Sequence, residues 1–259
     1  MIPVRVIPVL LLDGTRLVKT VKFKNPTYVG DPRIAVKIFN EKEVDELILL
    51  DISATPRHGE IQYDLIAEIV SEAFMPVCYG GGITDEEQLR RIICTGVEKV
   101  ALNTKAIREP TFVQRISERF GSSTIVISID ARKNFFGKYE VVTVGGRTNT
   151  KKDPRSVAAQ MQSLGAGEIL INSIDQDGER TGYNLDLIRM VTGAVDIPVI
   201  SCGGAGRLED LRQAVFVGGA SAVAAGSFFI FHGKHRAVLI SYPSQDELKV
   251  IFAGLSPNG

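Results

Sequence analysis

Two stretches of the chain, ELILLD at residues 46–51 and EILINSID at residues 168–175, are closely similar and lie 122 residues apart. A second pair, PVCYGGG at 76–82 and PVISCGGA at 198–205, repeats at the same offset. Each stretch holds a short apolar run that ends in glycine or acidic residues, as expected for a parallel strand buried on both faces. Because both pairs keep one offset near half the chain, the sequence predicts two related halves.

Other short apolar runs alternate with amphipathic segments from end to end. Eight such units in 259 residues favour a (β/α)₈ TIM barrel, an α/β fold. We expect one domain over residues 1–259, with half-barrels at about 1–122 and 123–245. Segments 17–23 and 139–147 are predicted to be strand-like insertions that form lids or hairpins. Strands are expected at 5–11, 46–51, 76–79, 99–103, 124–130, 168–173, 198–202 and 220–225, and helices at 31–44, 62–74, 84–95, 109–120, 153–165, 185–194, 207–217 and within 233–254.

The composition excludes several classes of protein. The chain has 30 Lys and Arg against 30 Asp and Glu, so binding to nucleic acid or to an acidic membrane is not expected, although local charge clusters remain open. Its three cysteines form no CxxC pair, which favours reduced thiols over disulfides or a metal site. No signal peptide or membrane-spanning run is recognisable. We therefore expect a cytoplasmic protein without metal or cofactor.

Glycine-rich sequences follow a strand and precede a helix in both halves. Glycines there let backbone N–H groups approach a phosphate, so that amides rather than lysines would hold the anion. One cradle in each half would suit a ligand with two phosphates. The simpler alternative is that these glycines only make tight turns. The predicted phosphate-binding residues are Gly81, Gly82, Asn103, Thr104, Asp177, Gly178, Gly203, Gly204, Gly226 and Ser227.

Acid–base chemistry is predicted at the same edge of the barrel. Asp130 ends the fifth strand, and Lys19 lies on the first insertion, where it could fold over the site. When the two halves are aligned, the fifth strand corresponds to residues 5–11, and Asp130 corresponds to Leu11. The alternative for an isolated aspartate is a helix cap, and Asp51 and Asp175 share that ambiguity.

Four charged residues stand at the starts of strands, at the opposite edge of the barrel. Two cations and two anions there could form a salt-bridge layer that gates an axial passage. The alternative is ordinary charge facing solvent. The four residues are Arg5, Glu46, Lys99 and Glu168.

Over about residues 4–231 the sequence resembles the cyclase subunit of imidazole glycerol phosphate synthase. The resemblance rests on an ordered set of motifs: Asp13-Gly14, Val18-Lys19, Gly30-Asp31-Pro32, Asp45-Glu46-Leu47, Gly80–Ile83, Asp130-Ala131-Arg132, residues 165–170, residues 173–178 and Gly203–Gly206.

This resemblance implies a lyase that works with a glutaminase subunit docked on the bottom of the barrel. Ammonia would pass the ring of four charges to a bisphosphorylated ribonucleotide held by both cradles at the top. Two aspartates, one in each half, would carry the acid–base steps that close the imidazole ring.

The chain departs from this pattern at the first of those aspartates, where it has Leu11. Asn172 and Cys202 replace a usual Thr and Ser, and residues 232–243 are unlike the usual ending. Such departures resemble a paralogous branch that serves amidation of a surface-polysaccharide sugar, in which ammonia passes to a separate sugar amidotransferase. A genuine cyclase of histidine biosynthesis is the alternative. A related phosphate-sugar isomerase is a weaker one, because it would also need an aspartate at position 11.

Overall fold

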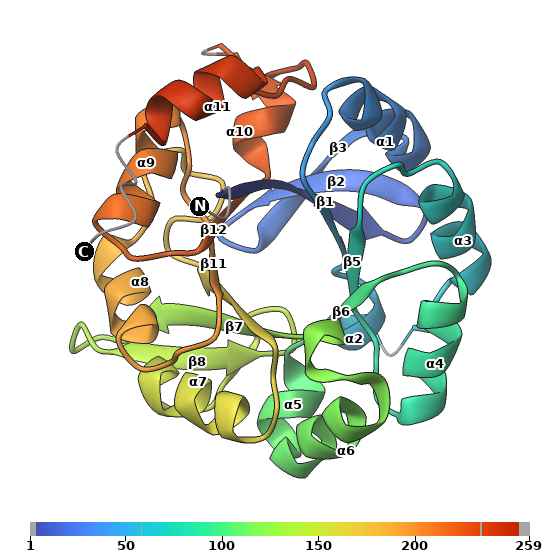
Figure 1. Ribbon diagram of the computed structural model, residues 1–259, viewed down its shortest axis with the longest axis vertical. Coiled ribbons are helices and arrows are strands. Elements are labelled where there is room, and N and C mark those ends of the chain that lie inside the picture. The colour runs from blue at the N-terminus through green and yellow to red at the C-terminus, as the bar shows by residue number, and fades with distance from the viewer. Residues whose placement is uncertain (1–3, 58, 234, 254–259) are drawn as a thin grey trace.

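A computed structural model describes residues 4–57, 59–233 and 235–253. Eight parallel strands pair in a ring, and the pairing of β7 with β10 and of β1 with β12 closes it (Figure 1). The predicted TIM barrel is confirmed. In the order of pairing the strands are β1 (Arg5–Asp13), β4 (Leu47–Asp51), β5 (Val77–Gly80), β6 (Lys99–Leu102), β7 (Ile125–Lys133), β10 (Glu168–Ser173), β11 (Val199–Cys202) and β12 (Ala222–Ala225).

Helices surround the barrel and cover the outer face of the strands (Figure 1). Local capping explains where several of them start. Asp31 and Asp153 each precede a proline and accept a hydrogen bond from a backbone N–H of the first helical turn. Asp85 accepts a hydrogen bond from the Gln88 N–H. The outer helices are α1 (Pro32–Glu41), α3 (Tyr63–Ser71), α4 (Glu86–Cys94), α6 (Pro110–Phe120), α7 (Pro154–Ser163), α8 (Leu185–Thr192), α9 (Leu208–Phe216) and α11 (Gln245–Ile251).

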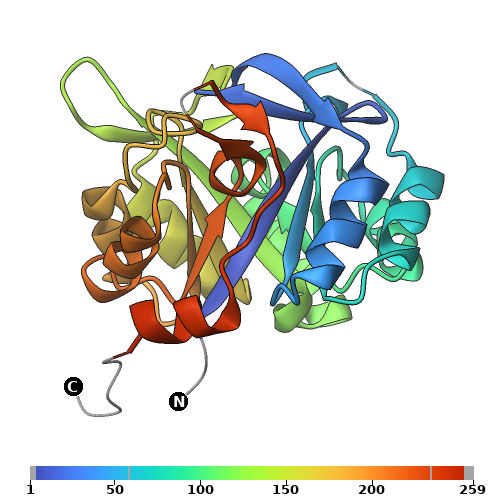
Figure 2. The same ribbon diagram turned by 90° about the horizontal axis from the view of Figure 1, so that it is seen from above.

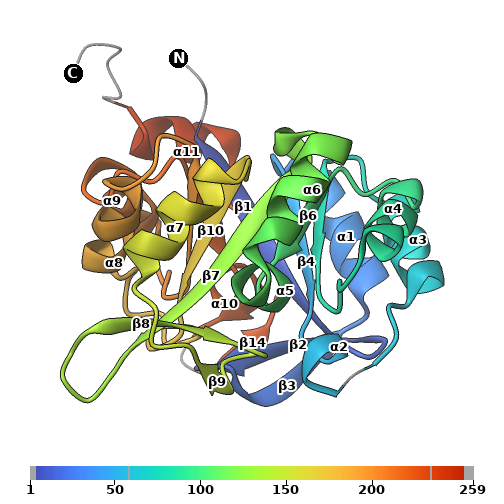
Figure 3. The ribbon, with the colours of Figure 1, turned by 90° about the horizontal axis from the view of Figure 1, so that it is seen from below.

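Both predicted insertions are antiparallel hairpins that extend barrel strands. The first runs from β1 into β2 (Arg16–Val21) and returns as β3 (Lys24–Gly30), a strand that the sequence did not predict. The second runs from β7 into β8 (Tyr139–Thr143) and β9 (Thr148–Asn149). Figures 2 and 3 show both hairpins at the same end of the barrel.

Several short elements complete the fold. Three of the short helices directly follow the barrel strands β4, β6 and β12, so they belong to the edge where the strands end. The short elements are α2 (Ala54–Arg57), α5 (Thr104–Arg108), η1 (Ser122–Thr124), α10 (Ser227–Ile230), β13 (Phe231–His232) and β14 (Ala237–Val238).

The buried apolar residues form two layers. One fills the space between strands and helices, and the other fills the inside of the barrel. Alternate residues of each strand point inward, so the interior is a packed core. The interior layer consists of Ile7, Val9, Ile48, Cys78, Ala101, Val126, Leu170, Ile200, Cys202, Ala222 and Ala224.

Two further observations concern the described residues alone. None of the helices there is long and apolar enough to cross a membrane, and no group of His, Cys, Asp and Glu side chains there is arranged to hold a metal ion. The cysteines are free thiols, with Cys78 and Cys202 buried and Cys94 exposed.

Candidate functional site

A cavity of about 270 Å³ opens where the strands end at their carboxyl edge. Its wall contains every predicted phosphate-binding residue, together with Lys19, Asp130 and Leu11. Active sites of barrel enzymes are built at this edge. The fold thus brings the predicted top-face residues into one site, whereas the four predicted gate residues lie outside it.

The two glycine turns have closely similar backbones. Gly81 in the first turn and Gly204 in the second have φ angles of 129° and 117°. A Cβ at Gly81 would overlap the Asp51 carbonyl, and one at Gly204 would overlap the Gly182 carbonyl. The turns therefore require glycine for steric reasons alone. Phosphate binding is a separate property that this close backbone approach permits.

The next pair of predicted residues also matches across the halves. Asn103 (φ −116°, ψ −84°) and Gly226 (φ −108°, ψ −75°) adopt nearly the same conformation, and each stands immediately before a short helix, α5 or α10. The Thr104 hydroxyl accepts a hydrogen bond from the Val144 N–H at 3.0 Å. This contact ties the start of α5 to the second hairpin.

Asp130 lies within β7, three residues before its last residue, and lines the cavity. It is buried, and burial raises the pKa of its carboxyl to about 7, with a smaller contribution from the negative charge of Asp177. The Asn103 amide donates to its carboxylate at 3.3 Å. A carboxyl with this pKa can give and take a proton near neutral pH.

Lys19 reaches into the same cavity from β2. Its ammonium donates to the Val9 carbonyl and lies against Gly226, where a side chain would collide with it. Burial lowers the pKa of Lys19 to about 8, although the nearby Asp177 carboxylate opposes this shift. Both Lys19 and Asp130 therefore have pKa values within about one unit of neutrality.

Asp177 and Gly178 connect the β10 loop to the first hairpin. The Thr20 hydroxyl donates to the Asp177 carboxylate at 3.2 Å, and the Lys22 N–H donates to the Asp177 carbonyl at 2.9 Å. A Cβ at Gly178 would overlap the Thr20 carbonyl. These two residues thus hold the strand that carries Lys19 over the barrel.

Asp51 and Asp175, which the sequence left ambiguous, serve local structure. One oxygen of Asp51 accepts from the Ser53 N–H at 2.8 Å and from the Ala54 N–H at 3.0 Å at the start of α2. Asp175 accepts from the Lys133 N–H at 2.8 Å. Asp13 pairs with Arg57 at 2.6 Å, so its carboxylate is already engaged.

Arginine and lysine side chains also line the cavity, in addition to the backbone amides that the sequence predicted to hold an anion. Arg57 comes from α2, Lys105 from α5 and Arg147 from the β8–β9 turn. None of these segments has a sequence motif that marks it, because each side chain reaches the cavity only through the packing of its element. Arg57 pairs with Asp13 and Lys105 pairs with Glu109, each at 2.6 Å, so part of this positive charge is neutralised locally.

Asn172 is a second feature of the cavity that was not predicted as a site residue. Among the described residues, its buried Oδ1 atom has no hydrogen-bond partner. It lies beside Gly203, at the second glycine turn. A buried acceptor that lines a cavity is available to a donor group of a ligand.

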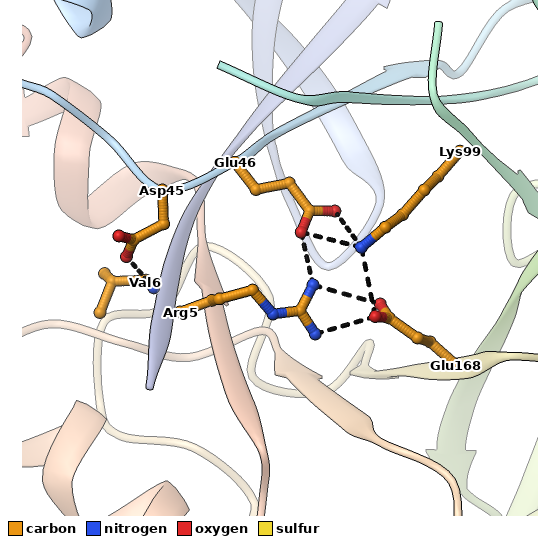
Figure 4. Close-up of polar contacts among 6 residues, drawn as sticks. All are labelled: Arg5, Val6, Asp45, Glu46, Lys99 and Glu168. Atoms are coloured by element: carbon orange, nitrogen blue, oxygen red, sulfur yellow. Dashed lines mark hydrogen bonds and ion pairs between the residues drawn. The ribbon is translucent and has the colours of Figure 1, made fainter. Parts of the chain in front are cut away.

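The four strand-start charges meet at the opposite edge of the barrel in a closed ring (Figure 4). Arg5 contacts Glu46 at 2.5 Å and Glu168 at 3.0 Å. Lys99 contacts Glu46 at 3.1 Å and Glu168 at 3.2 Å. The Glu46 side chain is only 3% exposed, so the alternative of ordinary charge facing solvent does not describe this ring. Burial lowers the pKa of Arg5, but its two glutamate partners outweigh this effect and raise it.

Comparison with known proteins shows a close relationship. Residues 5–236 match the family model of the histidine biosynthesis protein. A Pseudomonas aeruginosa protein, provisionally named imidazole glycerol phosphate synthase subunit hisF2, is 52% identical over 246 residues, covering 95% of this chain and 98% of that protein. A Vibrio vulnificus protein, provisionally named subunit hisF3, is 48% identical and covers 95% of each chain. The Streptomyces avermitilis imidazole glycerol phosphate synthase subunit HisF is 42% identical over 228 residues, covering 88% of this chain and 90% of that protein.

Proposed function

The chain belongs to the histidine biosynthesis protein family, and from that premise we propose that it receives ammonia and passes it on for amidation of a surface-polysaccharide sugar. Its relatives support a cyclase-type subunit of imidazole glycerol phosphate synthase as the coarser assignment. In the proposal, a glutaminase subunit docks on the bottom of the barrel. A separate sugar amidotransferase takes the ammonia at the top.

Leu11 is the observation that carries this proposal. It lies in the cavity wall, in the strand that the repeat relates to the strand of Asp130. An aliphatic side chain can neither give nor take a proton, and one positioned acid–base group contributes about 10²–10⁴-fold to a rate. A ring closure that uses two carboxyl groups would therefore be slower in this chain by about the same factor.

The interior of the barrel supports the ammonia route. Above the ring, the inward-facing residues are apolar or weakly polar, among them Ile48, Cys78 and Leu170, each at most 1% exposed. Ammonia is small and uncharged, so it loses far less hydration free energy on entering such a core than ammonium does. The ring is closed by its four ion pairs, and passage would require one cation to swing aside.

A genuine cyclase remains the second candidate, because the cavity keeps Asp130 and Lys19. Their pKa values of about 7 and about 8 suit proton transfer. In that case one carboxyl would have to serve both acid–base steps, or Lys19 would take over one of them.

An assay with free ammonia separates the two. Purified protein is given the bisphosphorylated ribonucleotide and an ammonium salt at alkaline pH, so that no glutaminase is needed. The Streptomyces avermitilis relative is assayed in parallel as a reference. We expect a rate of imidazole glycerol phosphate formation at least about 100-fold below that of the reference. Turnover comparable to the reference, or rescue of a histidine auxotroph that lacks its cyclase, would overturn the proposal.

The amidation role is tested by reconstitution. The chain is combined with a glutaminase subunit and a sugar amidotransferase, and glutamine is the nitrogen source. We expect glutamine-dependent amidation of the sugar that stops when this chain is omitted, while free ammonium restores it. Amidation from glutamine that proceeds without this chain would contradict the role.

A further inference from the structure

The turn between β7 and β8 presents two adjacent phenylalanines to solvent. Phe135 is 97% exposed and Phe136 is 83% exposed. Their rings pack edge to face at 5.6 Å and form a small apolar knob. Figure 3 shows this turn projecting away from the barrel, beyond the neighbouring elements. Large apolar groups that are clustered and exposed to solvent indicate an interaction site.

The segment around this knob is strongly basic, although the whole chain has no net charge. Residues 132–152 contain six Lys and Arg and one Glu. Arg147 lines the cavity and Lys152 bonds to the Ile107 carbonyl, so both are directed elsewhere. The four cations left for the hairpin itself are Arg132, Lys133, Lys138 and Lys151.

Two carboxylates near the hairpin, Glu140 and Asp175, offset part of this charge, which leaves the four cations in excess. Glu140 accepts from the amides of Asn134 and Asn149, at 2.7 and 2.5 Å. Asp175, at the base of the hairpin, accepts from the Lys133 N–H. The Lys133 ammonium lies 5.0 Å above the Tyr139 ring. The tip therefore combines an apolar knob with positive charge.

The turn is also held in one shape from within. The Asn134 side chain accepts from the N–H groups of Phe136 and Lys138, at 2.9 and 3.0 Å. Its carbonyl accepts from the Gly137 N–H at 3.0 Å. Three backbone donors of the tip are thus satisfied internally, which lowers the cost of moving the turn out of water.

We propose that the Phe135–Phe136 knob is a peripheral anchor for an anionic lipid bilayer. The two rings would enter the boundary between headgroups and acyl chains, and the surrounding cations would contact lipid phosphates. The zero net charge averages over the whole chain and does not describe this hairpin.

The shape of the tip favours a bilayer over a protein partner. A stable protein interface buries about 800 Å² on each partner, whereas a convex knob of two rings offers little flanking apolar surface. A bilayer adapts to a protruding knob, and its anionic headgroups complement the flanking cations.

Vesicle flotation tests this proposal on the full-length chain. The vesicles contain equal parts of phosphatidylglycerol and phosphatidylcholine, or phosphatidylcholine alone. We expect binding to the mixed vesicles that weakens as salt rises, and much weaker binding to the neutral ones. The double variant Phe135→Ser/Phe136→Ser should lower the partition coefficient about tenfold or more. Lys133→Gln and Lys138→Gln should each lower it roughly fivefold.

Phe74 provides the matched control. It is 89% exposed and lies between α3 and β5, at the opposite edge of the barrel. Phe74→Ser should leave vesicle binding unchanged, and circular dichroism with thermal melting should show that all variants remain folded. The proposal is overturned by absence of binding at low salt, by equal binding of the double variant, or by equal loss in Phe74→Ser. It is also overturned if the double variant keeps its vesicle binding and loses only affinity for a protein partner.

Discussion

Leu11 and Leu50 are direct register partners in β1 and β4, and both side chains line the cavity. In the other half of the barrel, the corresponding partners in β7 and β10 are Asp130 and Asn172. One half of the mouth therefore presents an apolar pair where the other presents a carboxyl and an amide. The cavity has acid–base capacity on one side, and its first-half wall cannot transfer a proton at this position.

Restoring a carboxyl to the first half should restore ring-closing activity. Since one positioned acid–base group contributes about 10²–10⁴-fold, we expect Leu11→Asp to raise imidazole glycerol phosphate formation by about 100-fold over the unmodified chain. The measurement is product formation from ammonium and the bisphosphorylated ribonucleotide. Leu11→Asn is the control, because it has the same shape as aspartate and cannot ionise. Equal gain in both variants would show that ionisation at this position is irrelevant.

The charge ring should be sensitive to the loss of one member. Glu46 is nearly fully buried and contacts both Arg5 and Lys99, so Glu46→Gln leaves two cations with one carboxylate between them. We expect the free energy of unfolding to fall by about 3–5 kcal/mol in urea titrations. Glu68→Gln, which removes an exposed partner of Arg33, should cost less than about 1 kcal/mol. Similar losses in the two variants would mean that the ring is no more important to stability than a surface pair.

The raised pKa of Asp130 should make stability depend on pH. In the folded chain this carboxyl keeps its proton up to about pH 7, whereas its ordinary pKa is 3.8. Between these values the folded state binds more protons than the unfolded state, so the free energy of unfolding falls as pH rises, by roughly 4 kcal/mol at most. Asp130→Asn should reduce this decline, part of which remains because burial also raises the pKa of Asp177. Asp196→Asn, at an exposed position, should leave it unchanged. An unchanged pH profile in Asp130→Asn would refute the shift.

The glycine turn should tolerate no side chain. A Cβ at Gly204 would overlap the Gly182 carbonyl, so Gly204→Ala should lower the free energy of unfolding by about 3 kcal/mol or more. Gly14 also has a positive φ, of 63°, but a Cβ there would meet no atom of the described residues within 4 Å. Gly14→Ala should therefore cost only about 1 kcal/mol. Equal effects in thermal or urea unfolding would show that backbone conformation, not the close approach, decides the requirement for glycine.

Much of the architecture could be predicted from local patterns. The eight apolar runs identify the barrel strands to within a few residues, because a strand buried on both faces must be apolar along its length. The predicted strand at 124–130 corresponds to β7 (Ile125–Lys133), and the predicted helix at 109–120 corresponds to α6 (Pro110–Phe120). The prediction missed β3, which contains Pro26 and has mostly exposed residues, so it carries no apolar run to mark it.

The positions of the candidate site residues could also be predicted from the sequence, whereas their roles could not be tested. The strand-end glycines, Asp130 and the four ring charges follow from position along the strands, because parallel strands bring all their ends to two edges. The roles of these residues in binding, catalysis and gating stay predictions, as does the division into halves at about residue 122.

By itself, then, the sequence determined the barrel, its repeat and the family, since these depend on the continuous apolar runs of the strands and on motifs in order. Only the tertiary structure decided which charges line the mouth, that Lys19 is buried against Gly226 with a lowered pKa, and that Phe135 and Phe136 stand in solvent. These properties depend on burial and on contacts between residues far apart in the chain. Such contacts have no local pattern, because they exist only once the barrel has closed.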